Sequence, residues 1–219
     1  MDFADIVLYI HILGWVIWLG TDVGVFIGAK FTENPSYSVE TRLTILKLAM
    51  ILDMAPRIAV PVVFTTGVYL MNVRYGIAFP SLPIGMVLGA IWTGVVVTGL
   101  LNEDGTSLGD LAKKGVLLIQ ACVVLLMGGA AVASLFGAAI FPLWIALKWL
   151  AYAWIAIFAI GIDITFKPAI ADYVRLQTEG ASDELNASLT KNLKPVYLTV
   201  LAVYFGTMVA AYFGVAKPL

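Results

Sequence analysis

The chain has little charge for its size. Of its 219 residues, 12% are Asp, Glu, Lys or Arg, whereas 61% are hydrophobic. A soluble globular domain has about 25% charged residues and about 45–50% apolar ones. The polar residues that remain here could not cover a water-exposed surface, so the composition predicts an integral membrane protein. The net charge of −1 leaves no basic surface for nucleic acid, which we exclude as a partner.

Cysteine and histidine are almost absent. The single cysteine, Cys122, excludes an intramolecular disulfide and a thiolate metal cluster. The single histidine, His11, excludes a haem bound by two histidines of one chain. The sequence also lacks a glycine-rich phosphate loop, a zinc-binding His-Glu-x-x-His motif and a Gly-x-Ser-x-Gly nucleophile elbow. Residues 1–5 carry acids where a secretory signal has basic residues, so we expect the first apolar run to be retained.

Six apolar runs are long enough to cross a bilayer, which needs about 20 mostly apolar residues per helix. They predict an all-α, polytopic membrane bundle that forms one domain over residues 1–219, with helices at about 3–28, 45–72, 84–101, 115–136, 142–166 and 194–214. The polar stretch 167–193 predicts an extension of the fifth helix, a stop at Gly180, and then a short separate helix capped by Ser182.

The basic residues predict how the bundle is oriented. Of the thirteen, two lie on the side of the even-numbered loops and two, Arg57 and Lys148, lie inside predicted helices. The other nine lie in or beside the odd-numbered loops: Lys30, Arg42, Lys47, Lys113, Lys114, Lys167, Arg175, Lys191 and Lys194. The positive-inside rule therefore predicts cytoplasmic odd loops, both termini outside, and a cell inner (plasma) membrane location.

Ionisable side chains inside the predicted helices are the first candidates for function, because they are costly in hydrocarbon and usually face a bundle interior or a water cavity. On the first helix, a wheel at about 100° per residue places His11, Trp15, Trp18 and Asp22 on one face. Glycines at four-residue intervals from Gly20 occupy the opposite face and would let another helix approach closely.

The face with His11 suggests a haem site. An imidazole inside a helical bundle with flat aromatic walls is typical of a haem iron ligand. The simpler interpretation is a hydrogen-bonded core histidine beside ordinary tryptophan packing. A second axial ligand, if there is one, cannot be histidine; Met50 and Met54 are candidates.

The fifth helix has a matching stripe, with Trp144, Lys148, Tyr152 and Asp163 on one side. Because the first and fifth helices run in the same direction, His11 and Lys148 are both expected in the outer half of the membrane. Lys148 has no acidic partner on its own helix at that depth. A haem propionate would supply one, and the alternative is that the lysine snorkels to the interface.

The second helix contains Asp53 and Arg57, four residues apart on one face, which predicts that they pair. Pro56 and Pro61 predict a kink in the same helix, because proline removes a backbone hydrogen bond. The kink could open space for a ligand or for a proton path.

Three segments resemble the CopD/HemJ-like superfamily. The string Tyr9-Ile10-His11-Ile12-Leu13-Gly14-Trp15-Val16-Ile17-Trp18 is similar to its first helix, which has a tryptophan seven residues after a histidine. Ala146-Leu147-Lys148 is similar to the His-Ala-Lys string of its penultimate helix, and Lys194-Pro195-Val196 to the start of its last helix. The resemblance covers about half of the chain.

HemJ members are four-helix membrane proteins that bind haem b and oxidise protoporphyrinogen IX, whereas other superfamily members are linked to copper uptake. The resemblance implies a four-helix core made by the first, second, fifth and sixth helices, with the third and fourth inserted. It further implies that His11 is the iron ligand and that Lys148 contacts haem or porphyrin.

The leading hypothesis is a haem b-binding redox membrane protein that oxidises a porphyrinogen or passes electrons to quinone. In it, His11 is the metal ligand, the cofactor-binding residues are Trp15, Trp18, Lys148 and Tyr152, and the catalytic residues are Lys148, Asp53 and Arg57. A proton, copper or small-solute transporter or channel is the first alternative, with Asp22, Asp53, Arg57 and Asp163 along its path. The second is an accessory subunit of a membrane complex, with a homo-oligomer as a related possibility.

Overall fold

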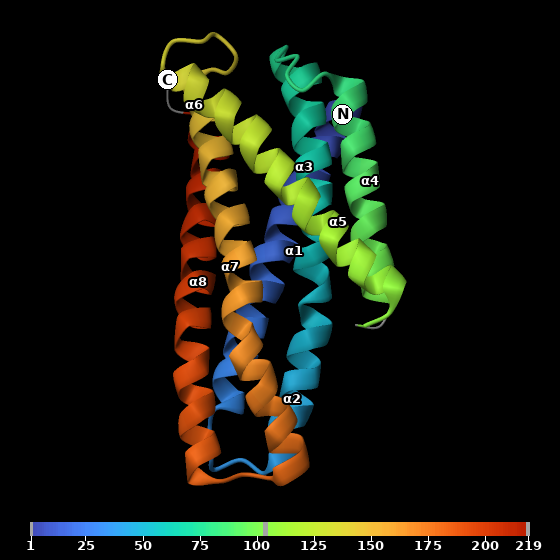
Figure 1. Cartoon of the computed structure of the whole chain (residues 1–219). Helices are drawn as coiled ribbons and strands as arrows, with labels where there is room; N and C mark the ends of the chain where they lie inside the picture. Colours follow the sequence, from blue (N-terminus) through green and yellow to red (C-terminus); the bar gives the residue numbers. More distant parts are fainter. Residues whose placement is uncertain (1, 103–104, 218–219) are drawn as a thin grey trace.

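The computed structural model of the chain describes residues 2–102 and 105–217 (Figure 1). Within these ranges the regular secondary structure is helical and contains no strand, as predicted. The helices are α1 (Phe3–Thr32), α2 (Val39–Leu52), α3 (Met54–Tyr75), α4 (Leu82–Leu101), α5 (Ser107–Val123), α6 (Gly129–Leu135), α7 (Leu143–Glu179) and α8 (Asp183–Ala216), with a π-helical turn, Val124–Gly128, between α5 and α6.

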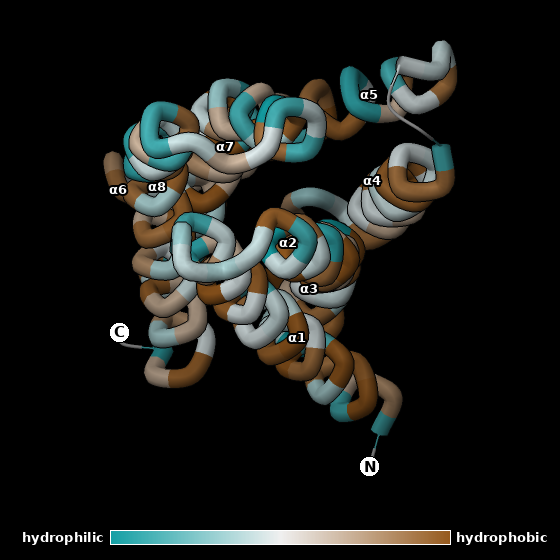
Figure 2. The backbone as a smooth tube through the Cα atoms, turned by 90° about the horizontal axis from the view of Figure 1, so that it is seen from below, coloured by the Kyte–Doolittle hydropathy of each residue, from teal (hydrophilic) through white to brown (hydrophobic). Residues whose placement is uncertain are grey.

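The described residues form six segments long and apolar enough to cross a membrane, which confirms the predicted number. The second segment consists of α2 and α3, and the fourth of α5, the π-helical turn and α6. Hydrophobic residues occur along all of the spanning helices (Figure 2). Many of their large side chains are exposed on the outside of the bundle, where lipid tails would contact them. α1 begins and α8 ends at the same end of the bundle (Figure 1), which we call the terminal end; the opposite end is the loop end.

Several predicted boundaries are wrong. The fourth span begins at Ser107, eight residues before the predicted start at 115; the starts of the second and sixth spans are more informative. The second span begins six residues earlier than expected, at Val39, and is interrupted at Asp53, just before Pro56. No separate short helix follows Ser182: its hydroxyl caps the Leu185 N–H at 3.1 Å, and α8 then runs without a break to Ala216. The polar stretch stays helical because it is amphipathic, with leucines at four-residue intervals from Leu185 that are buried.

Four helices extend past the level at which α4 ends. In the antiparallel pair of α3 and α4, Gly85 packs against Val68 and Gly89 against Thr65. This register puts Asp53 level with the end of α4 at Leu101. α7 has 37 residues and is therefore about 55 Å long, against about 30 Å of hydrocarbon. The parts of α1, α2, α7 and α8 beyond α4 (about residues 25–32, 39–52, 164–179 and 183–197) form what we call the extension (Figure 1).

The extension has its own apolar core, made largely by α7 and α8: Ala169, Tyr173, Leu176, Leu185, Leu189, Leu193, Val196 and Tyr197. A larger core with several aromatic residues, among them Trp18, Phe64, Trp92 and Trp149, lies closer to the terminal end. The bundle therefore has two cores along its axis, and only the larger one is level with α4.

Buried polar side chains connect the helices of the extension. Arg42 on α2 has no exposed surface; its Nε donates to the Thr32 carbonyl at 2.6 Å and its Nη1 to the Asn186 Oδ1 at 2.8 Å. The Thr32 hydroxyl in turn contacts the Tyr173 hydroxyl on α7. One arginine thereby connects α2 to the end of α1 and to α8.

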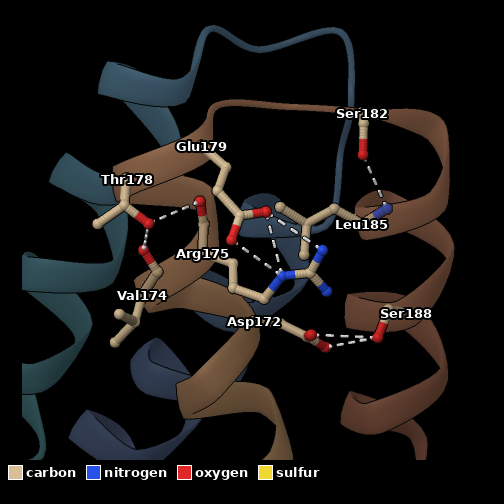
Figure 3. Close-up of polar contacts among 8 residues, drawn as sticks. All are labelled: Asp172, Val174, Arg175, Thr178, Glu179, Ser182, Leu185 and Ser188. Atoms are coloured by element: carbon tan, nitrogen blue, oxygen red, sulfur yellow. Dashed lines mark hydrogen bonds and ion pairs between the residues drawn. The ribbon is translucent and has the colours of Figure 1, made fainter.

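A second group joins α7 to α8. The Asp172 carboxylate accepts hydrogen bonds from the Ser188 hydroxyl at 3.0 Å and from the Asn192 amide at 2.7 Å. Figure 3 shows Asp172 facing Ser188 across the two helices, next to the surface pair of Arg175 and Glu179. These bonds fix the register of α7 against α8 in the extension.

Candidate functional site

A cavity of about 380 Å³ lies in the half of the bundle nearer the terminal end, between α1, α3, α7 and α8. Its volume is within the range of cofactor and small-molecule sites, about 300–1,000 Å³. The residues from α1 and α3 that line it include Leu8, His11, Ile12, Trp15, Val16, Leu19, Val63, Phe64, Gly67, Met71 and Tyr75. Those from α7 and α8 include Trp144, Ile145, Lys148, Trp149, Tyr152, Thr207, Met208, Ala211, Gly214 and Val215. Four of the predicted site residues, His11, Trp15, Lys148 and Tyr152, thus share one cavity.

His11 is 6% exposed, and hydrogen bonds fix its tautomer. The Thr66 hydroxyl donates its only proton to the Val62 carbonyl at 2.7 Å, so its oxygen accepts from His11 Nδ1–H at 2.9 Å. The Trp15 indole N–H donates to His11 Nε2 at 3.2 Å. The imidazole is therefore neutral, with its proton on Nδ1 and its lone pair on Nε2.

Close packing of α1 and α3 makes room for this imidazole. A Cβ atom at Gly67 would lie 3.2 Å from His11 Cε1, and one at Gly14 would lie 2.8 Å from the Val63 side chain. Any larger residue at either position would push the two helices apart or turn the ring. The lack of side chains at Gly14 and Gly67 thus allows α1 and α3 to pack closely with the His11 ring between them, facing the cavity.

The two tryptophans of α1 have different positions. Their rings are stacked, with centroids 5.1 Å apart and planes inclined by 19°. Trp15 lines the cavity, whereas Trp18 is 5% exposed and belongs to the core behind it. Trp18, which we expected in the pocket wall, therefore supports the wall and does not form it.

Lys148 reaches the cavity from α7. Its Nζ lies 6.0 Å from the centroid of the Trp15 ring, and a Cβ atom at Gly214 would lie 2.8 Å from it, so this glycine leaves space for the ammonium group. Among the described residues, Lys148 has no carboxylate partner. A second cation, Lys217, lies over the ring of Tyr75 at 5.0 Å at the same end.

Tyr152 contributes an unsatisfied hydroxyl. The residue lines the cavity and is 6% exposed, and within the described part of the chain its Oη is buried without a hydrogen-bond partner. A buried hydroxyl in this state is costly, about 1–3 kcal/mol. A polar ligand group or a water molecule in the cavity would satisfy it.

Asp53 and Arg57 do not line the cavity. The predicted pairing is confirmed, with 2.7 Å between Arg57 Nη2 and Asp53 Oδ2. The pair lies at the break between α2 and α3, level with the end of α4, and both side chains are partly exposed. Asp22 and Asp163 lie on the same side of the cavity, toward the loop end, so these ionisable side chains form a group apart from the cavity.

The methionines that reach the cavity are not the expected ones. Met50 and Met54 flank the same helix break and are exposed. Met71 and Met208 line the cavity, and the Met71 sulfur accepts a hydrogen bond from the Trp149 indole at 3.3 Å.

Within residues 2–102 and 105–217, no three His, Cys, Asp or Glu side chains come together as a metal site. A haem iron needs only one or two axial ligands from the protein, because the porphyrin supplies the others. The single imidazole is thus compatible with the role of a haem iron ligand.

Thr66 is the main site residue that the sequence does not reveal. Threonines in apolar helices usually bond to their own backbone, and this one does so as well. Its second contact, to His11, follows from the register of α1 against α3. The only indication in the sequence is the neighbouring Gly67, a small residue in an otherwise bulky stretch of helix, which is typical of a close approach by another helix.

No family model, curated protein or solved structure matches this chain.

Proposed function

We propose that the chain is a haem b-binding redox protein of the membrane, with the cofactor in the cavity between α1, α3, α7 and α8. The observation that carries this proposal is the state of His11: a buried, neutral imidazole whose Nε2 lone pair is held at the wall of an aromatic cavity. The resemblance to the CopD/HemJ-like superfamily, in which the corresponding histidine binds haem, supports it independently.

Each cavity residue has a role in this proposal. His11 Nε2 is the iron ligand, and it becomes available when the Trp15 indole moves off it. Thr66 accepts from Nδ1–H, which orients the ring and increases the basicity of Nε2. Lys148 and Tyr152 provide the charge and the hydroxyl that a propionate or a substrate oxygen requires.

The bound haem would supply one-electron redox chemistry. The substrate class is a porphyrinogen or a quinone, as the resemblance implies. Lys148 is the group best placed to hold or donate a proton at a bound substrate, because its Nζ is at the cavity and lacks a carboxylate partner among the described residues. Asp53 and Arg57 have no contact with the cavity to support a catalytic role.

The odd-numbered loops face the cytoplasm in this proposal, in a cell inner (plasma) membrane, because nine of the thirteen basic residues belong to that side. The cavity then lies in the outer half of the bilayer and the extension projects into the cytoplasm.

An optical spectrum tests the haem site. The full chain, produced in a haem-replete host and purified in detergent, is expected to show a Soret band and a reduced α band. His11→Ala should lose both bands, and added imidazole should restore part of the Soret band by occupying the vacated space. The control is Asp53→Asn, which lies outside the cavity and should keep the spectrum.

Two results would contradict the haem proposal: no haem band in the wild-type protein, or an unchanged band in His11→Ala.

A transport function has one supporting observation, the ionisable side chains of Asp22, Asp53, Arg57 and Asp163 toward the loop end, of which Asp53 and Arg57 form an ion pair. Proton or copper flux into proteoliposomes that disappears in Asp53→Asn, from a protein without a chromophore, would favour it over the haem proposal.

A further inference from the structure

The cavity is bordered by side chains that also face the outside of the bundle. On α1, Ile12 is 52% exposed and Val16 62%; on α8, Met208 is 57% exposed and Val215 86%. All four line the cavity. Because they are apolar and lie on membrane-spanning helices, the solvent they face is lipid and not water. The cavity therefore has a mouth toward the bilayer, between α1 and α8.

Two polar groups of the cavity, those of His11 and Tyr152, lie away from this mouth, whereas the Lys148 Nζ lies beside Gly214 on α8. His11 and Tyr152 are each 6% exposed, and they belong to faces of α1 and α7 that point into the bundle. Phe64 and Trp149 on the inner wall are likewise buried. The cavity is thus polar and aromatic at its inner wall and largely apolar at its opening, with Lys148 at one side. This pattern suits an amphiphile with its head inward.

The aromatic walls restrict the shape of the head. Trp15 lies flat against Trp18, and Trp149 packs edge-on to Tyr152 with ring centroids 5.5 Å apart. Planar rings stack well on such surfaces. The unsatisfied Tyr152 hydroxyl and the Lys148 ammonium group both donate hydrogen bonds, so the head must carry an acceptor, either a carbonyl or a carboxylate.

We infer that the cavity takes its ligand sideways from the bilayer, between α1 and α8, and that this ligand is a membrane-dissolved amphiphile with a planar ring and a carbonyl or carboxylate acceptor. The inference rests on the cavity being a ligand site, as in the proposed function, but not on the ligand being haem. Haem and a quinone with an alkyl tail both have this chemistry, and the experiment below separates them.

The test is to narrow the mouth and measure the rate of binding. Ala211 lies in the mouth, on an exposed part of α8. Ala211→Phe should slow the association of the ligand about tenfold or more, because the added ring blocks the passage. Ala90→Phe is the matched control: the same change on an exposed face of α4, away from the cavity, should leave the rate unchanged.

The full chain is studied in lipid nanodiscs, with decylubiquinone and haemin as separate probes, by stopped-flow quenching of tryptophan fluorescence. Lys148→Met should affect the other rate constant. It should leave the association rate of the ligand unchanged and speed its dissociation, because it removes a contact with the head of the ligand. This division between the two rate constants would not arise from a general loss of structure. Val16→Phe, across the mouth on α1, replaces Ala211→Phe if that variant does not purify as a single folded species.

The outcomes separate the two proposals. Unchanged association in both mouth variants would overturn the sideways route, while haemin binding that depends on His11 would still support the haem site. Binding of decylubiquinone but not of haemin, slowed by Ala211→Phe, would support the route and contradict the haem site. If neither probe binds the wild-type protein, both proposals fail.

Discussion

Buried polar groups occur at both ends of the bundle, but their surroundings differ. In the extension, Asp172 is bonded by side chains from the neighbouring helix, and Arg42 donates to groups at the end of α1 and on α8. In the cavity, the Tyr152 hydroxyl has no partner among the described residues and Lys148 has no acid. Most polar groups of the extension bond to a neighbouring helix, although Arg42 Nη2 has no hydrogen-bond partner among the described residues. In the cavity, the Tyr152 hydroxyl and the Lys148 ammonium group both face space that a ligand can occupy.

This contrast predicts that mutations in the two regions affect different properties. Changes in the extension should lower stability with little effect on ligand binding, and changes in the cavity should weaken binding with little effect on stability.

Arg42→Ala is expected to have the largest effect, a loss of about 3 kcal/mol in the free energy of unfolding, because it removes hydrogen bonds from buried partners and leaves a void in a packed site. Thermal unfolding in detergent measures it. Lys47→Ala, on an exposed turn of the same helix, is the control and should change stability very little. A loss as small as that of Lys47→Ala would mean that the Arg42 contacts do not stabilise the extension.

Thr66→Val should weaken haem binding about 10- to 100-fold, because His11 Nδ1–H loses the acceptor that orients the ring. The dissociation constant for haemin measures it. Thr98→Val, on an exposed part of α4, is the matched control, since Thr98 bonds only to its own helix. Equal haemin affinity in Thr66→Val and wild type would show that this hydrogen bond does not position the ligand.

Tyr152→Phe should leave the ligand-free protein as stable as the wild type or more stable, by up to about 1 kcal/mol, because it removes a buried hydroxyl that has no partner among the described residues. The same change should weaken ligand binding. Unfolding curves with and without ligand therefore shift in opposite directions. A loss of stability without ligand would indicate that a water molecule already satisfies the hydroxyl.

Asp53→Asn should have the smallest effect, below about 1 kcal/mol in stability, because its ion pair with Arg57 is partly exposed and such pairs contribute little. Haem binding should not change, since the pair lies outside the cavity. A large loss of redox activity in this variant, with the spectrum intact, would restore the catalytic role that the sequence suggested.

The sequence predicts the membrane segments and much of the cavity because both depend on local patterns, namely apolar runs and helical periodicity, that can be recognised without the tertiary structure. Apolar runs separated by Pro, Gly and charges define the spans. The helix wheel and the shared direction of α1 and α7 bring His11, Trp15, Lys148 and Tyr152 to one place. Trp18 shows the limit of this reasoning, because a wheel gives the face of a helix but not the depth at which a neighbour covers it.

The extension could not be predicted in the same way. Its helices contain many polar and charged residues, so the apolar runs of the sequence begin several residues after the true starts of α2 and α8. Arg42 is instructive: in the sequence it is one of nine basic residues that orient the loops, yet in the structure it is buried. Its partner Asn186 lies 144 residues away, and no local pattern connects the two.

The Trp15 indole N–H donates a hydrogen bond to His11 Nε2 and so occupies the lone pair that a ligand would use. Any incoming group that uses the Nε2 lone pair must displace the indole and lose a contact of about 1 kcal/mol. Weak donors such as water gain too little to displace it, whereas an iron–nitrogen bond gains much more. The hydrogen bond from Trp15 thus favours only those ligands that bind His11 Nε2 more strongly than the indole does.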